Sequence, residues 1–83
     1  MRIEVTAEDI AKGRRGGFNC PVAVAMNRAG CRQALAGFYE LNSLNSLRSC
    51  CETPLLVKAF IKAYDANEDV VPFSFELPDE FLL

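Results

Sequence analysis

Histidine is absent from the 83-residue chain, and so are C-x-x-C pairs and both standard glycine-rich nucleotide loops. Without histidine the chain lacks the commonest general base and the commonest metal ligand. The carboxylates fall at expected helix ends or in the C-terminal part, where no pair with separated pKa values in a cleft is indicated. The sequence therefore predicts a non-enzymatic protein with no catalytic residue, no metal site and no cofactor.

Long apolar runs are also missing. The run Pro21–Met26 is among the longest, far below the roughly 18–20 residues of a membrane-spanning helix. Met1–Val5 alternates charged and apolar residues with no apolar stretch behind it, so we expect no signal peptide. The hydrophobic fraction of 51% and the charged fraction of 24% are typical of a globular protein. We expect a single cytoplasmic domain spanning residues 1–83.

The four cysteines are expected to be reduced thiols with a packing role. They lie at Cys20, Cys31, Cys50 and Cys51, and without a secretory signal a disulfide framework is not favoured. On a strand, Cys50 and Cys51 would point to opposite faces and could not share one ion. Cys20, at an expected helix start, could have its thiol pKa lowered by the helix dipole. No histidine is present to act as its base, so we expect burial instead.

Local patterns predict the first strand and two helices. Residues 2–6 alternate as in a half-buried strand. Thr6 and Asp9 have the spacing of a capping box, and Gly13 is placed to end that helix. Pro21 suits the first turn of a second helix, which Gly30 would close.

The C-terminal half contains a third helix and a last strand. Thr53 and Pro54 form a helix start, followed by apolar residues at helical spacing, and Asn67 is suited to a left-handed cap. Residues 71–77 then alternate between apolar and polar side chains. Pro72 near its start and Pro78 directly after it indicate an edge strand, or one paired from Phe73 onward.

The middle segment fits two structures. Residues 33–41 have apolar residues at spacings that suit either a strand or a helix. Gly37 and the turn-rich stretch 42–46 favour a hairpin with a return strand at 47–52. The predicted fold is then a small single α+β domain of order β-α-α-β-β-α-β, with a three- or four-stranded, mostly antiparallel sheet and about three helices.

Charge is divided unevenly along the chain. Residues 1–48 carry seven Lys or Arg against four Asp or Glu, a net +3, and residues 49–83 carry two against seven, a net −5. The GRRGG stretch at 13–17 could hold an anion through glycine amides and arginines. Short loops of this composition are common in compact domains, however, so a solvated linker is the favoured interpretation. The candidates for anion or nucleic-acid contact are Lys12, Arg14, Arg15, Arg28 and Arg32.

The acidic C-terminal region is the candidate surface for a protein partner. Its residues are Glu68, Asp69, Asp79, Glu80, Phe81, Leu82 and Leu83. The last three are apolar and either fold back over the sheet or form a contact patch. The aromatic residues elsewhere lack interleaved Lys or Arg, so we expect core packing and not a base-stacking platform: Phe38, Tyr39, Phe60, Tyr64, Phe73 and Phe75.

Three motifs resemble a family of small phage and prophage proteins with no known activity: TAEDIAKG at 6–13, CPVAVA at 20–25 and YDANEDVVPFSFEL at 64–77. They cover about a third to a half of the chain, and residues 31–52 match nothing in the family. Many of these relatives have a further cysteine where this chain has Gly17 and Phe18, which argues against a shared metal site.

The resemblance implies a phage accessory protein that binds a host protein in the host cytoplasm and inhibits or redirects it. Inhibitors of host defence, of the anti-CRISPR kind, are one such group. The alternative is a small nucleic-acid-binding protein that uses the Arg14/Arg15 loop. A homodimer fits either interpretation, and a membrane partner fits neither.

Overall fold

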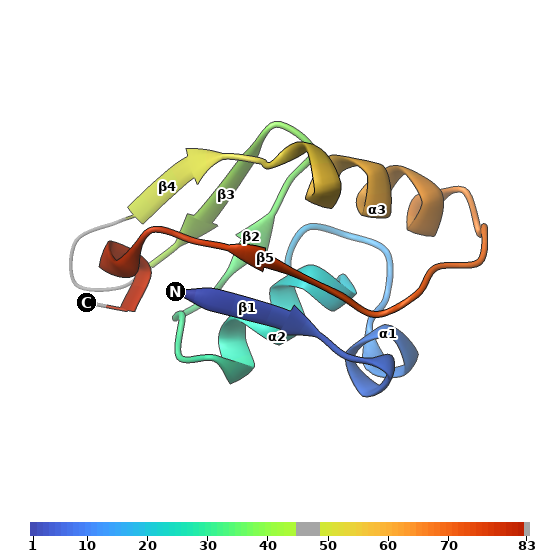
Figure 1. Ribbon diagram of the computed structural model, residues 1–83, viewed down its shortest axis with the longest axis horizontal. Helices are drawn as coiled ribbons and strands as arrows, with labels where there is room; N and C mark the ends of the chain where they lie inside the picture. The colour runs from blue at the N-terminus through green and yellow to red at the C-terminus, as the bar shows by residue number, and fades with distance from the viewer. Residues whose placement is uncertain (45–48, 83) are drawn as a thin grey trace.

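The computed structural model describes residues 1–44 and 49–82, and within them it confirms the α+β class (Figure 1). Within these residues, three α-helices, five strands and one 3-10 helix follow one another. Their bounds are β1 Arg2–Val5, α1 Ala7–Lys12, α2 Pro21–Arg28, β2 Leu35–Ala36, β3 Glu40–Ser43, β4 Ser49–Glu52, α3 Leu55–Asp65, β5 Phe73–Glu76 and η1 Asp79–Leu82.

The strands form two antiparallel sheets where one sheet of three or four strands was predicted. β1 pairs with β5, and β2, β3 and β4 form a separate three-stranded sheet in that order. The additional strand arises because the chain reverses within the segment expected to be a single strand. There the Gly37 amide donates to the Glu40 carbonyl at 3.0 Å, which separates β2 from β3. The predicted turn stretch 42–46 instead continues β3 to Ser43, and residues 45–48 lie outside the described residues.

The ends of the first two helices confirm the sequence prediction. Thr6 Oγ1 accepts a hydrogen bond from the Asp9 amide, and the Asp9 carboxylate accepts one from the Thr6 amide, so the capping box of α1 is complete. Gly13 caps the C-terminus of α1. Pro21 occupies the first turn of α2, and Gly30 follows that helix with a φ of 114°.

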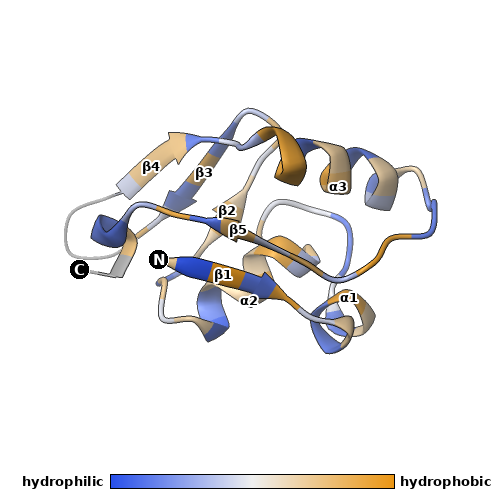
Figure 2. Ribbon diagram, in the orientation of Figure 1, coloured by the Kyte–Doolittle hydropathy of each residue, from blue (hydrophilic) through white to orange (hydrophobic). Residues whose placement is uncertain are grey.

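The third helix begins one residue later than predicted. Its N-cap is Pro54, because the Thr53 hydroxyl donates instead to the Gly37 carbonyl at 2.8 Å. Asn67 follows the helix with a φ of 61°, as expected of a left-handed residue. Figure 2 shows the first turn of α3 as hydrophobic, yet Leu55 and Leu56 there are exposed.

The core lies between the two sheets and the helices. α2 packs against both β1 and β2, and its apolar side is buried with Ile3, Val5 and Leu41. Phe73 of β5 connects this core to α3, because its ring lies 4.8 Å from that of Phe60. The inner sides of α2 and α3 contribute Val22, Ala23, Ala25, Met26, Val57, Phe60 and Ile61.

Candidate functional site

The three-stranded sheet buries one face and leaves the other open. Strand side chains alternate between the two faces, and Leu41 and Ser43 of β3 are buried. The opposite face, here called the outer face, has exposed or half-buried side chains. It consists of Leu35, Glu40, Asn42, Cys50 and Glu52, which the strand register places side by side.

A hollow of about 420 Å³ lies over the β2 and β3 part of the outer face. Three large apolar side chains at this hollow are half or more exposed: Phe18 at 61%, Tyr39 at 77% and Leu44 at 50%. Exposed apolar side chains gathered around one hollow are a mark of an interaction surface. The described residues that line it are Phe18, Gln33, Leu35, Gly37, Phe38, Tyr39, Glu40, Asn42 and Leu44.

Phe18 reaches this hollow because its loop is fastened to the edge of β2. The Gly17 carbonyl accepts a hydrogen bond from the Ala36 amide at 2.7 Å. Within the loop, the backbone amide of Arg14 donates to the Asn19 carbonyl at 2.8 Å. A Cβ atom on Gly17 would meet the Cδ1 atom of Leu35, so a larger residue here would require the Leu35 side chain to move. The loop predicted as a solvated linker is thus hydrogen-bonded to the sheet.

Phe38 and Tyr39 form the tip of the β2–β3 hairpin, and the prediction that they are core residues is wrong. Phe38 is 39% exposed and Tyr39 is 77% exposed. Their rings meet edge to face with centroids 5.2 Å apart. Lys58 of α3 places its Nζ 5.5 Å and 5.6 Å from the two centroids, which is cation–π distance. The tip is therefore held in place by α3 while its rings stay in contact with solvent.

Gln33 lies at the rim of the hollow with a φ of 45°, a left-handed conformation that is uncommon for residues other than glycine. The adjacent Arg32 carbonyl accepts hydrogen bonds from the Leu44 amide at 2.8 Å and the Ser43 hydroxyl at 2.9 Å. These bonds fix the chain on either side of the hollow. Strained residues of this kind are concentrated at functional sites.

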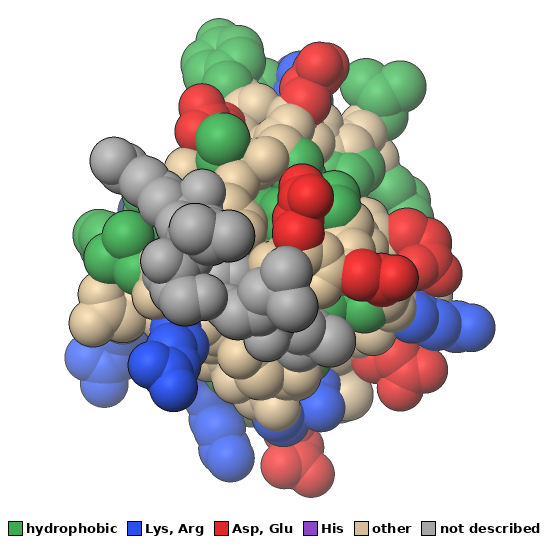
Figure 3. Space-filling model, turned by 90° about the vertical axis from the view of Figure 1, so that its left-hand side faces the viewer, with side chains coloured by type: hydrophobic (Ala, Val, Ile, Leu, Met, Phe, Trp, Pro, Cys, Tyr) green, Lys and Arg blue, Asp and Glu red, His purple; other side chains and the backbone are tan. Residues whose placement is uncertain are grey.

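The predicted acidic contact surface is divided between two ends of the molecule. Glu68 and Asp69 follow α3 at one end, whereas Asp79 and Glu80 belong to η1 at the other (Figure 1). At the η1 end, acidic side chains stand in several separate places and not in one patch (Figure 3). β5 runs between the two acidic pairs, so the chain cannot bring them together.

The apolar C-terminal residues do not supply the predicted contact patch where the structure describes them. Phe81 is fully buried, so it folds back into the core, which is one of the two outcomes expected for this tail. The side chain of Leu82 and the whole of Leu83 lie outside the described part of the chain. Asp79 accepts a hydrogen bond from the N-terminal amine at 2.7 Å, and this bond, with the amine's charge, lowers the pKa of Asp79.

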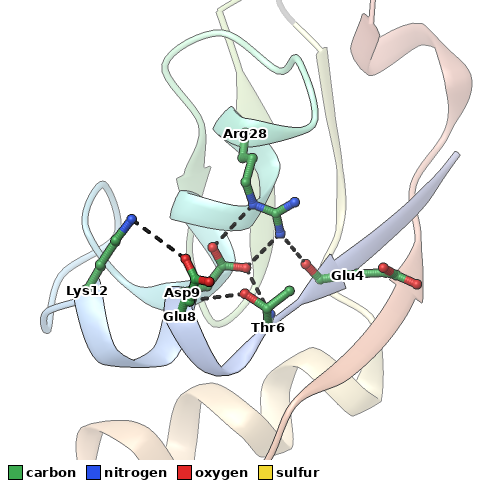
Figure 4. Close-up of polar contacts among 6 residues, drawn as sticks. All are labelled: Glu4, Thr6, Glu8, Asp9, Lys12 and Arg28. Carbon is green, nitrogen blue, oxygen red and sulfur yellow. Dashed lines mark hydrogen bonds and ion pairs between the residues drawn. The ribbon is translucent and has the colours of Figure 1, made fainter.

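The five basic candidates are spread over the surface, and none lines the hollow. Arg28 is ion-paired with Asp9 at 2.8 Å and also donates to the Glu4 carbonyl (Figure 4). Two other candidates have acidic neighbours: Lys12 lies 4.0 Å from Glu8, and Arg15 lines a second hollow together with Glu68 and Asp69. The side chains of Arg14 and Arg32 are exposed.

Cys20 and Cys31 are buried, as predicted, whereas Cys50 is exposed. Burial raises the pKa of the Cys20 thiol, and hydrogen bonds from nearby backbone amides oppose this only in part. The helix start therefore does not activate this thiol. Among residues 1–44 and 49–82, no group of three or more His, Cys, Asp or Glu is arranged to hold a metal ion. In the same ranges, no helix has the length and apolar character needed to cross a bilayer.

No protein-family model, curated protein or solved structure matches this chain. Function therefore has to be inferred from the chemistry of the surface itself.

Proposed function

We propose that this chain is a non-enzymatic binding protein that holds a protein partner against the hollow of its outer face. One observation carries the proposal: Phe18, Tyr39 and Leu44 surround one hollow and are each half or more exposed. Aromatic side chains are enriched in protein interfaces and supply much of the binding energy there. The hydrogen bond from Ala36 to Gly17 and the contact of Lys58 with the two rings support the site, because they fix the loop and the hairpin tip before any partner arrives.

The motif resemblance supports a phage context for this binding. In that context the partner is a host protein in the host cytoplasm, for example part of a defence complex, and binding inhibits or redirects it. The resembling segments 6–13, 20–25 and 64–77 form α1, the start of α2 and the region of β5. The hollow is built mainly from the segment 31–52, where the resemblance ends. A common scaffold with a chain-specific contact surface suits proteins that bind different hosts' targets.

The charge of the hollow favours a protein over a nucleic acid. Among the described residues of the lining, Glu40 is the charged one and none is Lys or Arg. Nucleic-acid sites usually present several basic side chains to the phosphates. The Arg14/Arg15 loop remains the alternative site for nucleic acid, and a nuclease treatment tests it directly.

The test is affinity capture from host lysate, with and without nuclease, read by mass spectrometry. Three forms of the chain are compared: wild type, the hollow variant F18S/Y39S and the control variant L56S/V71S. Leu56 and Val71 are also exposed apolar residues, at 55% and 72%, but they line a different hollow beside α3. Circular dichroism establishes that each variant is folded.

We expect wild type and the control variant to capture the same discrete host protein in nuclease-treated lysate. The hollow variant should recover at least tenfold less, as expected for loss of two aromatic contacts of about 1 kcal/mol or more each. Equal recovery by the hollow variant would exclude this surface. Material that disappears with nuclease would instead assign function to the arginine loop.

A further inference from the structure

The outer edge of β4 presents unpaired backbone groups. β4 is an edge strand of the three-stranded sheet, and the Thr53 amide donates to the Tyr39 carbonyl at 3.1 Å. In an antiparallel ladder, hydrogen-bonded pairs alternate with non-bonded pairs. Thr53 and Tyr39 form one bonded pair, and the next bonded pair is Cys51 with Leu41. Cys50 and Glu52 belong to the non-bonded pairs, so their amides and carbonyls point away from β3.

No described residue occupies this edge. Neither Cys50 nor Glu52 has a backbone hydrogen-bond partner in residues 1–44 and 49–82, and both side chains are exposed. At the other end of the strand, the Ser49 hydroxyl donates to the Glu80 carbonyl of η1. By contrast, the opposite edge of the same sheet is covered where the Ala36 amide bonds to Gly17. Open edges of this kind accept an additional strand.

The acidic side chains beside the edge indicate the charge of that strand. Glu40 and Glu52 are directly paired across β3 and β4, in a non-bonded pair, where side chains lie closest. Both are exposed, and within the described residues neither carboxylate forms an ion pair. Like charges directly opposite each other destabilise a sheet. A cation supplied from outside would relieve this repulsion.

We propose that the β4 edge binds an extended, basic segment of a protein partner as a fourth strand of the sheet. The amides and carbonyls of Cys50 and Glu52 bond to the backbone of that segment. A Lys or Arg of the segment lies on the outer face, beside Glu52 and within reach of Glu40. This deepens the proposed function and rests on it, because the segment extends the same outer face.

Charge also decides against a second copy of this chain as the occupant. Antiparallel pairing of two β4 strands would bring the Glu40 and Glu52 carboxylates of both copies onto one continuous face. Four carboxylates would then gather with no described cation among them. A basic partner segment reverses that interaction, since each carboxylate gains an opposite charge.

The test uses synthetic peptides and the full chain labelled for NMR. The probe is acetyl-Thr-Val-Thr-Arg-Thr-Val-Thr-amide, an extended peptide with its Val and Arg side chains on one face. Matched probes replace Arg by Glu or carry methyl groups on the backbone nitrogens. We expect the Arg peptide to shift the Cys50 and Glu52 amide signals and to bind about fivefold more tightly than the Glu peptide. Backbone methylation should abolish binding.

Variants of the chain extend the test. E40Q/E52Q should remove the preference for the Arg peptide. Cys50→Pro should block the edge, because the Cys50 amide does not belong to the β3–β4 ladder, and Cys50→Ser is its control. Equal binding of the Arg and Glu peptides, or shifts confined to other residues, would overturn the proposal. Concentration-dependent shifts of the same amides without peptide would show a second copy at the edge and also overturn it.

The capture experiment distinguishes failure of the strand-addition proposal from failure of the proposed function. If F18S/Y39S no longer captures the host protein but Cys50→Pro still does, the proposed function is supported and the strand-addition proposal is excluded. If neither variant changes the capture, both proposals fall.

Discussion

Asp9 joins three segments of the chain through one buried carboxylate (Figure 4). It accepts hydrogen bonds from the Thr6 amide at 2.8 Å and from Arg28 Nη2 at 2.8 Å. Arg28 in turn donates to the Glu4 carbonyl of β1 at 2.7 Å. The capping role of Asp9 could be predicted because it depends on neighbours three residues away. The pairing with Arg28, nineteen residues along, has no local signature, so Arg28 was predicted as an anion contact.

We expect Asp9→Asn to lower the free energy of unfolding at pH 7 by roughly 1–2 kcal/mol, through loss of charged hydrogen bonds. Burial by itself raises the pKa of Asp9, but the bonds from Arg28 and Thr6 outweigh it and the net pKa is lowered. A lowered pKa gives stability that is present at neutral pH and lost as pH falls through the folded-state value. The gap between wild type and variant should therefore shrink below about pH 4.

Urea unfolding at pH 7 and pH 3 measures this difference. Glu8→Gln is the control, because Glu8 is an exposed acid in the same turn of α1. A gap that is the same at both pH values would contradict the assigned ion pair.

At the scale of elements, the β2–β3 hairpin shows where local patterns stop being informative. Residues 33–41 satisfy both strand and helix spacing, so contacts with distant segments decide between them. Two such contacts are the bond from the Ala36 amide to Gly17 and the bond from the Thr53 hydroxyl to Gly37. The same contacts leave Phe38 and Tyr39 exposed, a placement that hydrophobicity alone could not predict.

Thr53 is buried, and its hydroxyl holds the base of the hairpin turn. Thr53→Val keeps the shape of the side chain but removes the donor to the Gly37 carbonyl. We expect a loss of about 1–2 kcal/mol of stability and faster hydrogen exchange at the Gly37 and Thr53 amides, which belong to the turn. Thr53→Ser retains the hydroxyl and should keep most of the protection. Unchanged exchange in Thr53→Val would mean that the turn is held by other contacts.

At the scale of the whole molecule, the class and most of the element order could be predicted, but the additional strand and the division into two sheets could not. β1 and β5 have local signatures, whereas the choice of partner strand depends on contacts across the chain. The predicted acidic surface shows the same limit, because proximity along the sequence does not decide proximity in space. Residues 49–83 are acidic as a sequence, yet the length of β5 separates Glu68 and Asp69 from Asp79 and Glu80.

The two ends of the chain are joined by a charge contact. The Met1 amine donates to the Leu77 carbonyl at 2.6 Å and to Asp79 at 2.7 Å, and Glu76 lies 3.7 Å away. The hydrogen bond to Asp79, opposed by partial burial and assisted by the two acidic charges, raises the pKa of this amine. A raised pKa gives stability that is present below the unfolded value of about 8 and is lost as pH rises through the folded value.

We therefore expect wild type to be more stable than Asp79→Asn at pH 7, with the difference decreasing by pH 10. Unfolding in urea at both pH values measures it, and comparison of the two chains cancels other groups that titrate in this range. Glu68→Gln, which removes an exposed acid at the far end of the molecule, should show no such change. If Asp79→Asn and wild type lose stability in parallel, the contact does not contribute.

The pairing of β1 with β5 also has a consequence for the order of events during protein synthesis. Ile3 lies opposite Phe75, seventy-two positions later in the chain. β1 therefore leaves the ribosome well before its strand partner. Until residues 73–76 emerge, the amides of β1 cannot be satisfied by their native partner. Completion of this sheet is a late step, and in that interval the first strand is open to chaperones and proteases.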